Sequence, residues 1–174
     1  MRKIVLIFGL IAGGNLSAFL AAPFLLKGSA NLEHGMLYGY ATMVLSLLLI
    51  TFGVRQYRDQ AGAAGLGFWK GFQVGFLIFV VAGLCYVITW EILYRTVASG
   101  FITDYMTKSL EHARAAGATE AQLAAQRAEM AKFMAMYANP LFRAMMSFLE
   151  PLPVGLVLSL VTAWVLRRPA AVEA

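Results

Sequence analysis

Residues 71–90 read GFQVGFLIFVVAGLCYVITW and contain no charged side chain. A bilayer core about 30 Å thick is crossed by ~20 apolar residues, because an α-helix rises 1.5 Å per residue. This stretch is therefore long enough to span a membrane, and we expect the span to occupy residues 71–94. In lipid it must be a helix, because a lone strand would leave its backbone polar groups without partners.

Three further segments meet the same requirement. Residues 4–26 and 35–54 contain no charged side chain. The fourth segment is residues 141–166, and from position 144 onward its only charged residue is Glu150. The sequence thus predicts an all-α integral membrane protein, a four-helix bundle that forms a single membrane domain over residues 1–174. The N-terminal apolar run exceeds the roughly 7–15 residues of a signal-peptide core, so we expect it to be retained as a span.

The composition agrees with a membrane protein. Of the 174 residues, 60% are hydrophobic and 13% are charged, whereas soluble domains carry about 25% charged residues. The net charge is +5, but the basic residues lie at the ends of apolar runs rather than in one patch. The expected partner is therefore the lipid bilayer and not a nucleic acid. Cys85 is the only cysteine, which excludes an internal disulfide and a cysteine-based metal site.

The loops predict the direction of the spans. Four spans place both termini on one side of the membrane, and the basic residues of that side lie close to the span ends in short segments. The opposite side has as many basic residues, together with most of the acids. The positive-inside rule then places both termini in the cytoplasm and residues 95–140 outside it. The basic residues on the side of the termini are Arg2, Lys3, Arg55, Arg58, Lys70, Arg167 and Arg168.

The segment between the third and fourth spans predicts a helical hairpin at about residues 98–138. A first helix ends before Gly117, because glycine suits the position after a helix C-terminus. A second helix begins after Thr119, where Gln122 completes a capping box. It ends at Asn139, and Pro140 suits the first turn of the fourth span. Both helices are amphipathic, so the hairpin is expected to fold on itself or on the membrane surface.

Residues 55–70 join the second and third spans and are rich in glycine and alanine, which predicts a flexible turn. They open with RQYRD at residues 55–59. Anchoring at the cytoplasmic end of a span explains these charges. Contact with anionic lipid or with a cytoplasmic partner is the alternative.

Small residues recur at four-residue spacing in the spans, where they let helix backbones approach closely. One interpretation is packing within a single bundle, and the other is a seam between copies of the chain. The residues concerned are Gly9, Gly13, Ser17 and Ala21 in the first span, Gly35 and Gly39 in the second, and Gly67, Gly71 and Gly75 at the third.

Glu150 is an acid within a span, and it is followed by Pro151 and Pro153. Such an acid costs roughly 2.5–3.5 kcal/mol on insertion scales. Pro151 cannot donate to the carbonyl of Ser147, so a kink is expected there. Glu150 and the kink beside it could form an ion or proton site. The alternative is a structural joint in which Glu150 pairs with Arg143 or Arg95.

Glu91 precedes Arg95 by four residues, the favourable order for an ion pair on a helix. The rings of Tyr86, Trp90 and Tyr94 follow the same spacing, which is typical of aromatic anchors at a membrane interface. If Glu91 also faced Glu150, the two acids would form an acidic site at the outer end of the bundle.

No motif for a cofactor or for catalysis is present. The chain lacks a P-loop, a Gly-x-Ser-x-Gly elbow and a His-Glu-x-x-His pair. Its nine methionines suggest soft-metal binding, but no tight His/Met motif accompanies His34 and His112. We therefore predict no cofactor, no metal and no catalytic residues.

Several stretches resemble the bacterial membrane proteins of domain-of-unknown-function family 4199. The resemblance covers nearly the whole chain and implies a four-helix protein of the bacterial inner membrane, with no established activity and no catalytic residues to carry over. The stretches are MRKIVLIFGLIAG (1–13), GYATMVLSLLLITFGVRQYRDQ (39–60), GFWKGFQVGFLI (67–78), YVITWEI (86–92) and NPLFRAMMSFLEPLPVGLVLSLVTAWVLRR (139–168).

Three functions remain open from the sequence. The first is a non-enzymatic accessory or scaffold subunit, or a homo-oligomer, that works by association with itself or another membrane protein. The second is a small oligomeric transporter of ions, protons or solutes that uses Glu150 and the kink at Pro151. The third is an envelope lipid enzyme that uses Glu91 and Glu150 as acid and base, although no nucleophile or metal set accompanies them.

Overall fold

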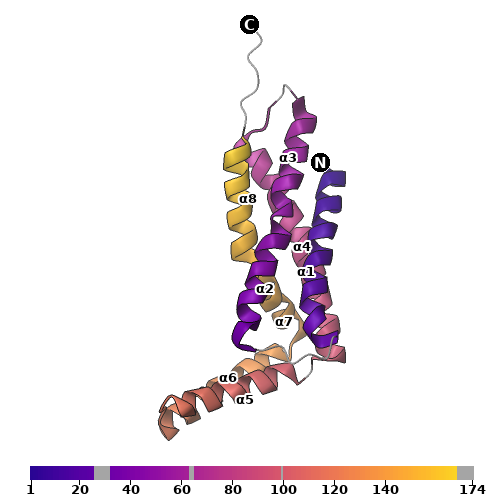
Figure 1. Ribbon diagram of the computed structural model, residues 1–174. Coiled ribbons are helices and arrows are strands. Elements are labelled where there is room, and N and C mark those ends of the chain that lie inside the picture. Colours follow the sequence, from indigo (N-terminus) through magenta and orange to yellow (C-terminus); the bar gives the residue numbers. More distant parts are fainter. Residues whose placement is uncertain (26–31, 63–64, 99, 168–174) are drawn as a thin grey trace. The chain divides into compact units, whose positions relative to one another are not determined.

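The computed structural model describes residues 1–25, 32–62, 65–98 and 100–167, without the side chains of residues 32–38 and 101. Lys27 and Arg168 lie outside this description, and of Glu33, His34 and Gly35 only the helical backbone is described. Within the described residues every regular element is an α-helix (Figure 1). The helices are α1 (Arg2–Leu25), α2 (Leu32–Leu47), α3 (Leu49–Ala61), α4 (Phe68–Thr96), α5 (Phe101–Ala115), α6 (Glu120–Tyr137), α7 (Pro140–Leu149) and α8 (Leu152–Leu166).

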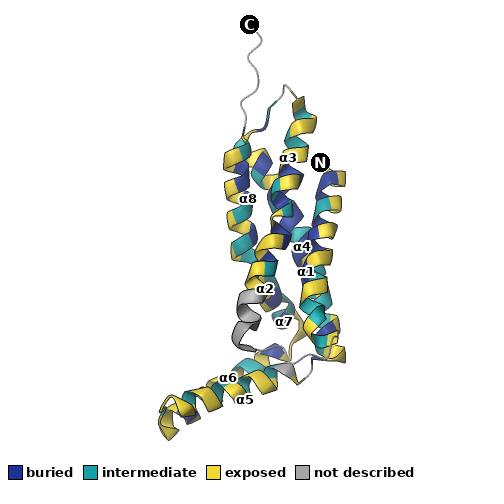
Figure 2. Ribbon diagram, viewed as in Figure 1, coloured by how far each residue is buried: buried dark blue, intermediate teal, exposed yellow. Residues whose placement is uncertain are grey.

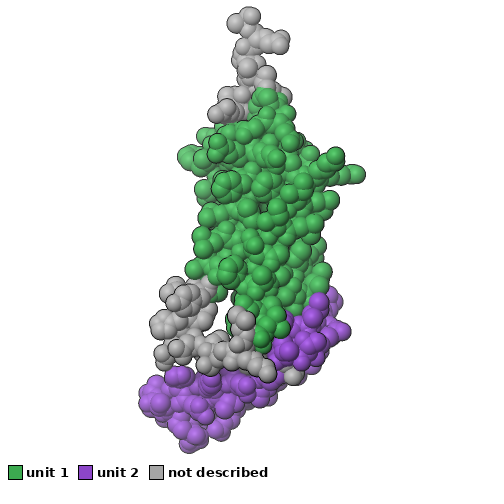
Figure 3. All heavy atoms as spheres, turned by 45° about the vertical axis from the view of Figure 1, so that its right-hand side comes forward, with its two compact units in different colours: residues 1–90, 147–174 green, residues 91–146 purple. Residues whose placement is uncertain are grey.

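The chain divides into two compact units (Figure 3). Unit 1 comprises residues 1–90 and 147–174, and unit 2 comprises residues 91–146. Helices α4 and α7 each contribute residues to both units.

Three helical segments are long and apolar enough to cross a membrane: α1, residues 39–61, and α4. The pair α7 and α8 meets the test as a fourth span if its two bent helices are counted together. The all-α class predicted from the sequence is therefore confirmed, and the apolar helices indicate a membrane-embedded protein.

The second apolar run differs from its predicted bounds. Its helix is interrupted by a turn at Leu48, and α3 then continues seven residues beyond Val54, to Ala61. The prediction of a flexible turn from residue 55 is therefore wrong for residues 55–61. The helix continues because its inward face extends past the predicted end: Ile50 and Val54 are buried, and the side chain of Arg58, one turn further on, is only 14% exposed. It ends at Gly62, whose φ of 56° is readily adopted only by glycine.

The core of unit 1 lies where α1, α3 and α8 meet the first part of α4. Helix α1 contacts α2 and α3, and α8 contacts the same two helices. Each helix turns one buried face inward and an exposed apolar face outward (Figure 2). The largest fully buried side chains include Phe79, Leu47, Ile50, Leu66 and Ile78. Outward apolar faces are what a hydrocarbon environment requires, since lipid tails are as apolar as leucine.

The predicted packing glycines lie at helix contacts inside unit 1. A Cβ added to Gly9 would lie 2.6 Å from Cβ of Val81, and one added to Gly13 would lie 2.6 Å from Cβ of Cys85. Helices α1 and α4 therefore approach as closely as their backbones permit. A Cβ added to Gly71 would lie 3.4 Å from Ala163 of α8, and one added to Gly75 would lie 3.4 Å from Ser159 of α8 and 3.1 Å from Ile50. This placement corresponds to the packing interpretation for all four glycines.

The fourth apolar run is broken where the proline pair predicts a kink. Helix α7 ends at Leu149 and α8 begins at Leu152, with a bend of 41° between them. Pro151 is the N-cap residue of α8, and Pro153 lies in its first turn. The break coincides with the proline pair, and proline removes a helical hydrogen bond at this point.

In unit 2, the helix signals of the sequence are borne out. Helix α5 ends at Ala115, and Gly117 has a φ of 87°. The hydroxyl of Thr119 accepts from the backbone N–H of Gln122, whose side chain accepts from the backbone N–H of Thr119. This is the predicted capping box. Helices α5 and α6 contact each other, and Pro140 begins α7.

The close contact between α1 and α4 predicts that a single added methyl group at this contact destabilises the protein. Gly13→Ala should lower the free energy of unfolding by about 1–3 kcal/mol, the usual effect of overpacking a filled site. Gly39→Ala is the matched control, because a Cβ there meets nothing within 4 Å. Reversible unfolding in mixed detergent micelles measures both variants, and equal stability of the two would contradict the close contact.

Candidate functional site

The most enclosed charged group of unit 2 is the guanidinium of Arg143 on α7. Its Nε donates to Oε1 of Glu91 and its Nη2 to Oε2, both at 2.7 Å. Its third nitrogen, Nη1, donates to the carbonyl of Tyr137 at 3.1 Å. The side chain is only 4% exposed. A two-point contact with a carboxylate matches the planar fork of arginine, so the geometry fixes the orientation of both groups.

Two aromatic rings complete this site. The Cζ of Arg143 lies 4.1 Å from the ring centroid of Tyr94 and 5.8 Å from that of Tyr137. The two tyrosine rings meet edge to face, with centroids 5.7 Å apart. A cation this close to the face of a ring is attracted by its quadrupole. The site therefore ties the last turns of α4 to the end of α6 and the start of α7.

Glu91 also forms the ion pair with Arg95 that the four-residue spacing predicts. The Arg95 Nη2 lies 3.7 Å from Oε2 of Glu91, and the Arg95 side chain is 66% exposed. Exposed ion pairs of this kind contribute little to the stability of the fold, because water screens the attraction between the two charges. Arg143 is thus the principal partner of Glu91, and Arg95 is a peripheral one.

Glu150 lies in unit 1 at the break between α7 and α8. Its Oε2 accepts a hydrogen bond of 2.8 Å from the hydroxyl of Tyr86 on α4. Tyr86 is buried, whereas Glu150 is exposed. The structural-joint interpretation pairs Glu150 with Arg143 or Arg95, which both belong to unit 2, and that pairing stays a prediction. Within unit 1 the hydrogen bond of the carboxylate comes from a neutral phenol. Glu91 and Glu150 belong to different units, and the hypothesis that they face each other stays a prediction.

The aromatic stripe of α4 does not lie at the surface as expected for interfacial anchors. Tyr86 and Trp90 are buried within unit 1. The ring of Trp90 packs against that of Phe24 on α1, with centroids 6.1 Å apart. Tyr94 packs inside unit 2, as described above. Tyr86 and Trp90 are thus buried among the helices of unit 1, whereas Tyr94 is half-buried in unit 2.

Sequence reasoning missed three pairings: Arg143 with Glu91, Arg143 with the carbonyl of Tyr137, and Glu150 with the phenol of Tyr86. In each pairing the two groups lie on different elements of the structure, so no spacing within one helix indicates them. Among the described residues, no three His, Cys, Asp or Glu side chains gather closely enough to hold a metal ion. The charged groups of unit 2 are arranged for cohesion, because the carboxylate and the guanidinium satisfy each other.

A family model described as "Protein of unknown function (DUF4199)" matches residues 7–168. The chain belongs to this family. Neither the curated proteins nor the solved structures contain a match to the chain. The DUF4199 match takes in Glu91, Arg143 and Glu150, and it confirms the family to which the sequence motifs pointed. It adds no activity, so the chemistry of this DUF4199 protein must be argued from its own geometry.

Because Arg143 is buried, we predict that neutralising Glu91 and neutralising Arg95 have unequal effects on the free energy of unfolding. Glu91→Gln should lower the free energy of unfolding by about 3–5 kcal/mol, because it leaves a buried guanidinium without a counter-charge. Arg95→Gln removes only an exposed partner and should change it by less than about 1 kcal/mol. Detergent-induced unfolding followed by circular dichroism measures both, and equal effects would show that Arg143 is not the principal partner.

Proposed function

We propose that this protein is a multi-pass protein of the bacterial inner membrane that works by association rather than by catalysis. In this proposal four spans form a bundle, both termini face the cytoplasm, and α5 and α6 form a hairpin outside it. The partner with which the protein associates is a second copy of the same chain. The apolar lengths of the helices and the basic residues near the span ends support this arrangement.

The observation that carries the proposal is the position of Asn15. It lies about 20 Å along α1 from Arg2, near the middle of the helix, and it is exposed. Within the described residues, its amide has no hydrogen-bond partner. Hydrocarbon offers no hydrogen bonds, so an outward amide at this depth favours association with another helix that supplies them.

The surface beside Asn15 suits close approach by a second helix. A Cβ added at Gly14 would meet nothing within 4 Å, and Ala18 is exposed one turn further on. A glycine and an alanine four residues apart allow two helix backbones to approach closely. Gly13, by contrast, already faces α4, so α1 uses adjacent glycines in two directions. The inward one packs the unit, and the outward one is open for a partner.

The pairing of the other polar groups argues against an enzyme. Glu91 is held by Arg143 and Arg95, and Arg143 is enclosed by tyrosine rings. Catalysis requires a nucleophile or a base with access to substrate and with a partner that orients it. The Glu91 carboxylate instead neutralises a buried cation, which is a structural task.

A test of the association proposal uses introduced cysteines in a Cys85→Ala background. Ala18→Cys should form a disulfide-linked dimer in native membranes, because Ala18 lies on the proposed seam. Val161→Cys on the exposed face of α8 is the matched control and should stay monomeric. Adding Asn15→Leu should weaken self-association by about 3- to 30-fold, the range for one interhelical hydrogen bond in lipid. Monomer alone at Ala18→Cys would contradict the proposal.

One observation favours a second candidate, a small oligomeric transporter. Glu150 is an exposed carboxylate at a helix break, and its hydrogen bond within unit 1 comes from a single phenol. An ionisable group within a span is a functional candidate by default. In liposomes loaded with a pH-sensitive dye, this candidate predicts proton flux that Glu150→Gln abolishes. Tyr86→Phe, which removes only the hydrogen bond, should alter the flux rather than abolish it. Flux equal to that of empty liposomes would exclude this candidate.

A further inference from the structure

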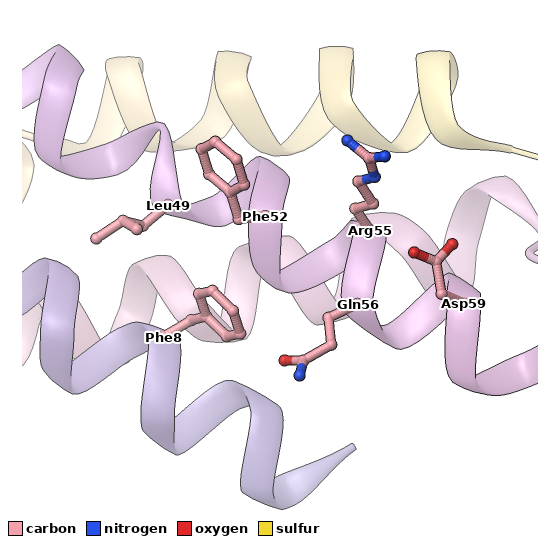
Figure 4. Close-up of a pocket in the computed structure, with 6 residues that line it drawn as sticks. All are labelled: Phe8, Leu49, Phe52, Arg55, Gln56 and Asp59. Atoms are coloured by element: carbon pink, nitrogen blue, oxygen red, sulfur yellow. The ribbon is translucent and has the colours of Figure 1, made fainter.

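A groove of about 440 Å³ lies on the surface of unit 1 between α1 and α3. Phe8 from α1 and Leu49 and Phe52 from α3 line its apolar part (Figure 4). Arg55, Gln56 and Asp59 line its polar part, one to two turns further along α3. The lining from residue 49 to residue 59 extends for about 15 Å along the helix. The groove is therefore apolar along one part of its length and polar at one end.

The polar end of the groove contains a positive charge, that of Arg55, that forms no ion pair among the described residues. Arg58 holds Asp59, with its Nε and Nη2 at 3.0 and 2.8 Å from Oδ1 of the carboxylate. This pair balances the only acid of the groove. In the part of the chain that the structure describes, Arg55 has neither an ion-pair nor a hydrogen-bond partner. Arg55 is exposed and lines the groove, and so does Gln56, whose side chain points to the other side of α3 in Figure 4.

We infer that this groove binds an anionic glycerophospholipid of the surrounding leaflet. One acyl chain lies along Phe8, Leu49 and Phe52, and the phosphate is bound by Arg55. Arginine suits this task because its fork of N–H groups matches the oxygens of a phosphate. The bound lipid supplies the counter-charge that Arg55 lacks within the protein.

The order of the lining residues favours a lipid over a peptide or a second copy of the chain. The apolar lining belongs to a segment long and apolar enough to cross a membrane, and the charged lining lies at the end of that segment. A phospholipid has the same arrangement as this lining, with an apolar chain inside the membrane and a charged headgroup at the membrane surface. A partner helix would instead need an apolar or small-residue face along the whole groove.

Native mass spectrometry of the full-length protein in detergent tests this inference. The probes are dioleoylphosphatidylglycerol, dioleoylphosphatidylcholine and inorganic phosphate. We expect one molecule of phosphatidylglycerol per chain, bound more tightly than phosphatidylcholine, and no retention of phosphate alone. Arg55→Gln should weaken phosphatidylglycerol binding about fivefold, the equivalent of ~1 kcal/mol for one basic residue near anionic lipid. Phosphatidylcholine binding should change little.

Matched variants separate the groove from general surface charge. Gln56→Glu adds a negative charge to the lining of the groove and should weaken phosphatidylglycerol binding, whereas Gln60→Glu makes the same change outside the groove. Arg167→Gln removes a cation from α8, where Arg167 lies over the ring of Trp164, and should leave binding unchanged. Phe52→Ala should weaken both lipids alike, because it shortens the apolar surface.

Three results would overturn the inference. The first is an unchanged preference for phosphatidylglycerol in Arg55→Gln. The second is an equal loss in Arg167→Gln, which would indicate charge attraction without a site. The third is a dimer that Phe52→Ala dissociates while no lipid is retained, which would assign the groove to a second copy. The altered side chains are exposed, and circular dichroism confirms that each variant is folded before binding is compared.

Discussion

The fold depends on one constraint, namely that hydrocarbon neither forms hydrogen bonds nor drives apolar surfaces together. Backbone groups must therefore be paired within helices, and cohesion between helices must come from close packing and from bonds between polar side chains. Unit 1 shows both. Gly13 lets α1 meet α4 at Cys85, and beside it Thr89 donates to Ser17 at 2.8 Å. Thr51 and Thr162 join α3 to α8 in the same way.

The same constraint sorts the polar side chains into two groups. Those that lie inside a unit are paired: Arg143 with Glu91, and Thr51 with Thr162. Asn15 and Arg55 point outward without a partner among the described residues. A protein that satisfies its inner polar groups this fully leaves its outward ones to molecules around it. The amide of Asn15 suits a helix, and the guanidinium of Arg55 suits a phosphate, so the two residues indicate two kinds of neighbour.

Local signals in the sequence predicted the helices and their ends. The capping box at Thr119, the glycine at 117 and the kink at Pro151 each depend on residues within one or two turns. The long extent of α3 was missed, because its charged residues suggested the end of a span although its buried face continues to Val54 and beyond. The partners of Glu91 and Glu150 were only partly predicted. Arg95 is four residues from Glu91, whereas Tyr86 and Glu150 are 64 residues apart, and no local spacing connects them.

The two outward features adjoin on α1, because Phe8, which lines the groove of Arg55, lies on the same helix as Asn15. Phe8 and Asn15 are seven residues apart on α1, which places them on the same face about 10 Å from each other along the axis. A second copy seated against Asn15 would thus lie beside the lipid groove at Phe8. By linkage, any effect of the bound lipid on self-association must equal the effect of self-association on lipid affinity. In the two proposals Arg55 acts through the lipid and Asn15 through the second copy, so the sign of this coupling decides whether anionic lipid joins the copies or separates them.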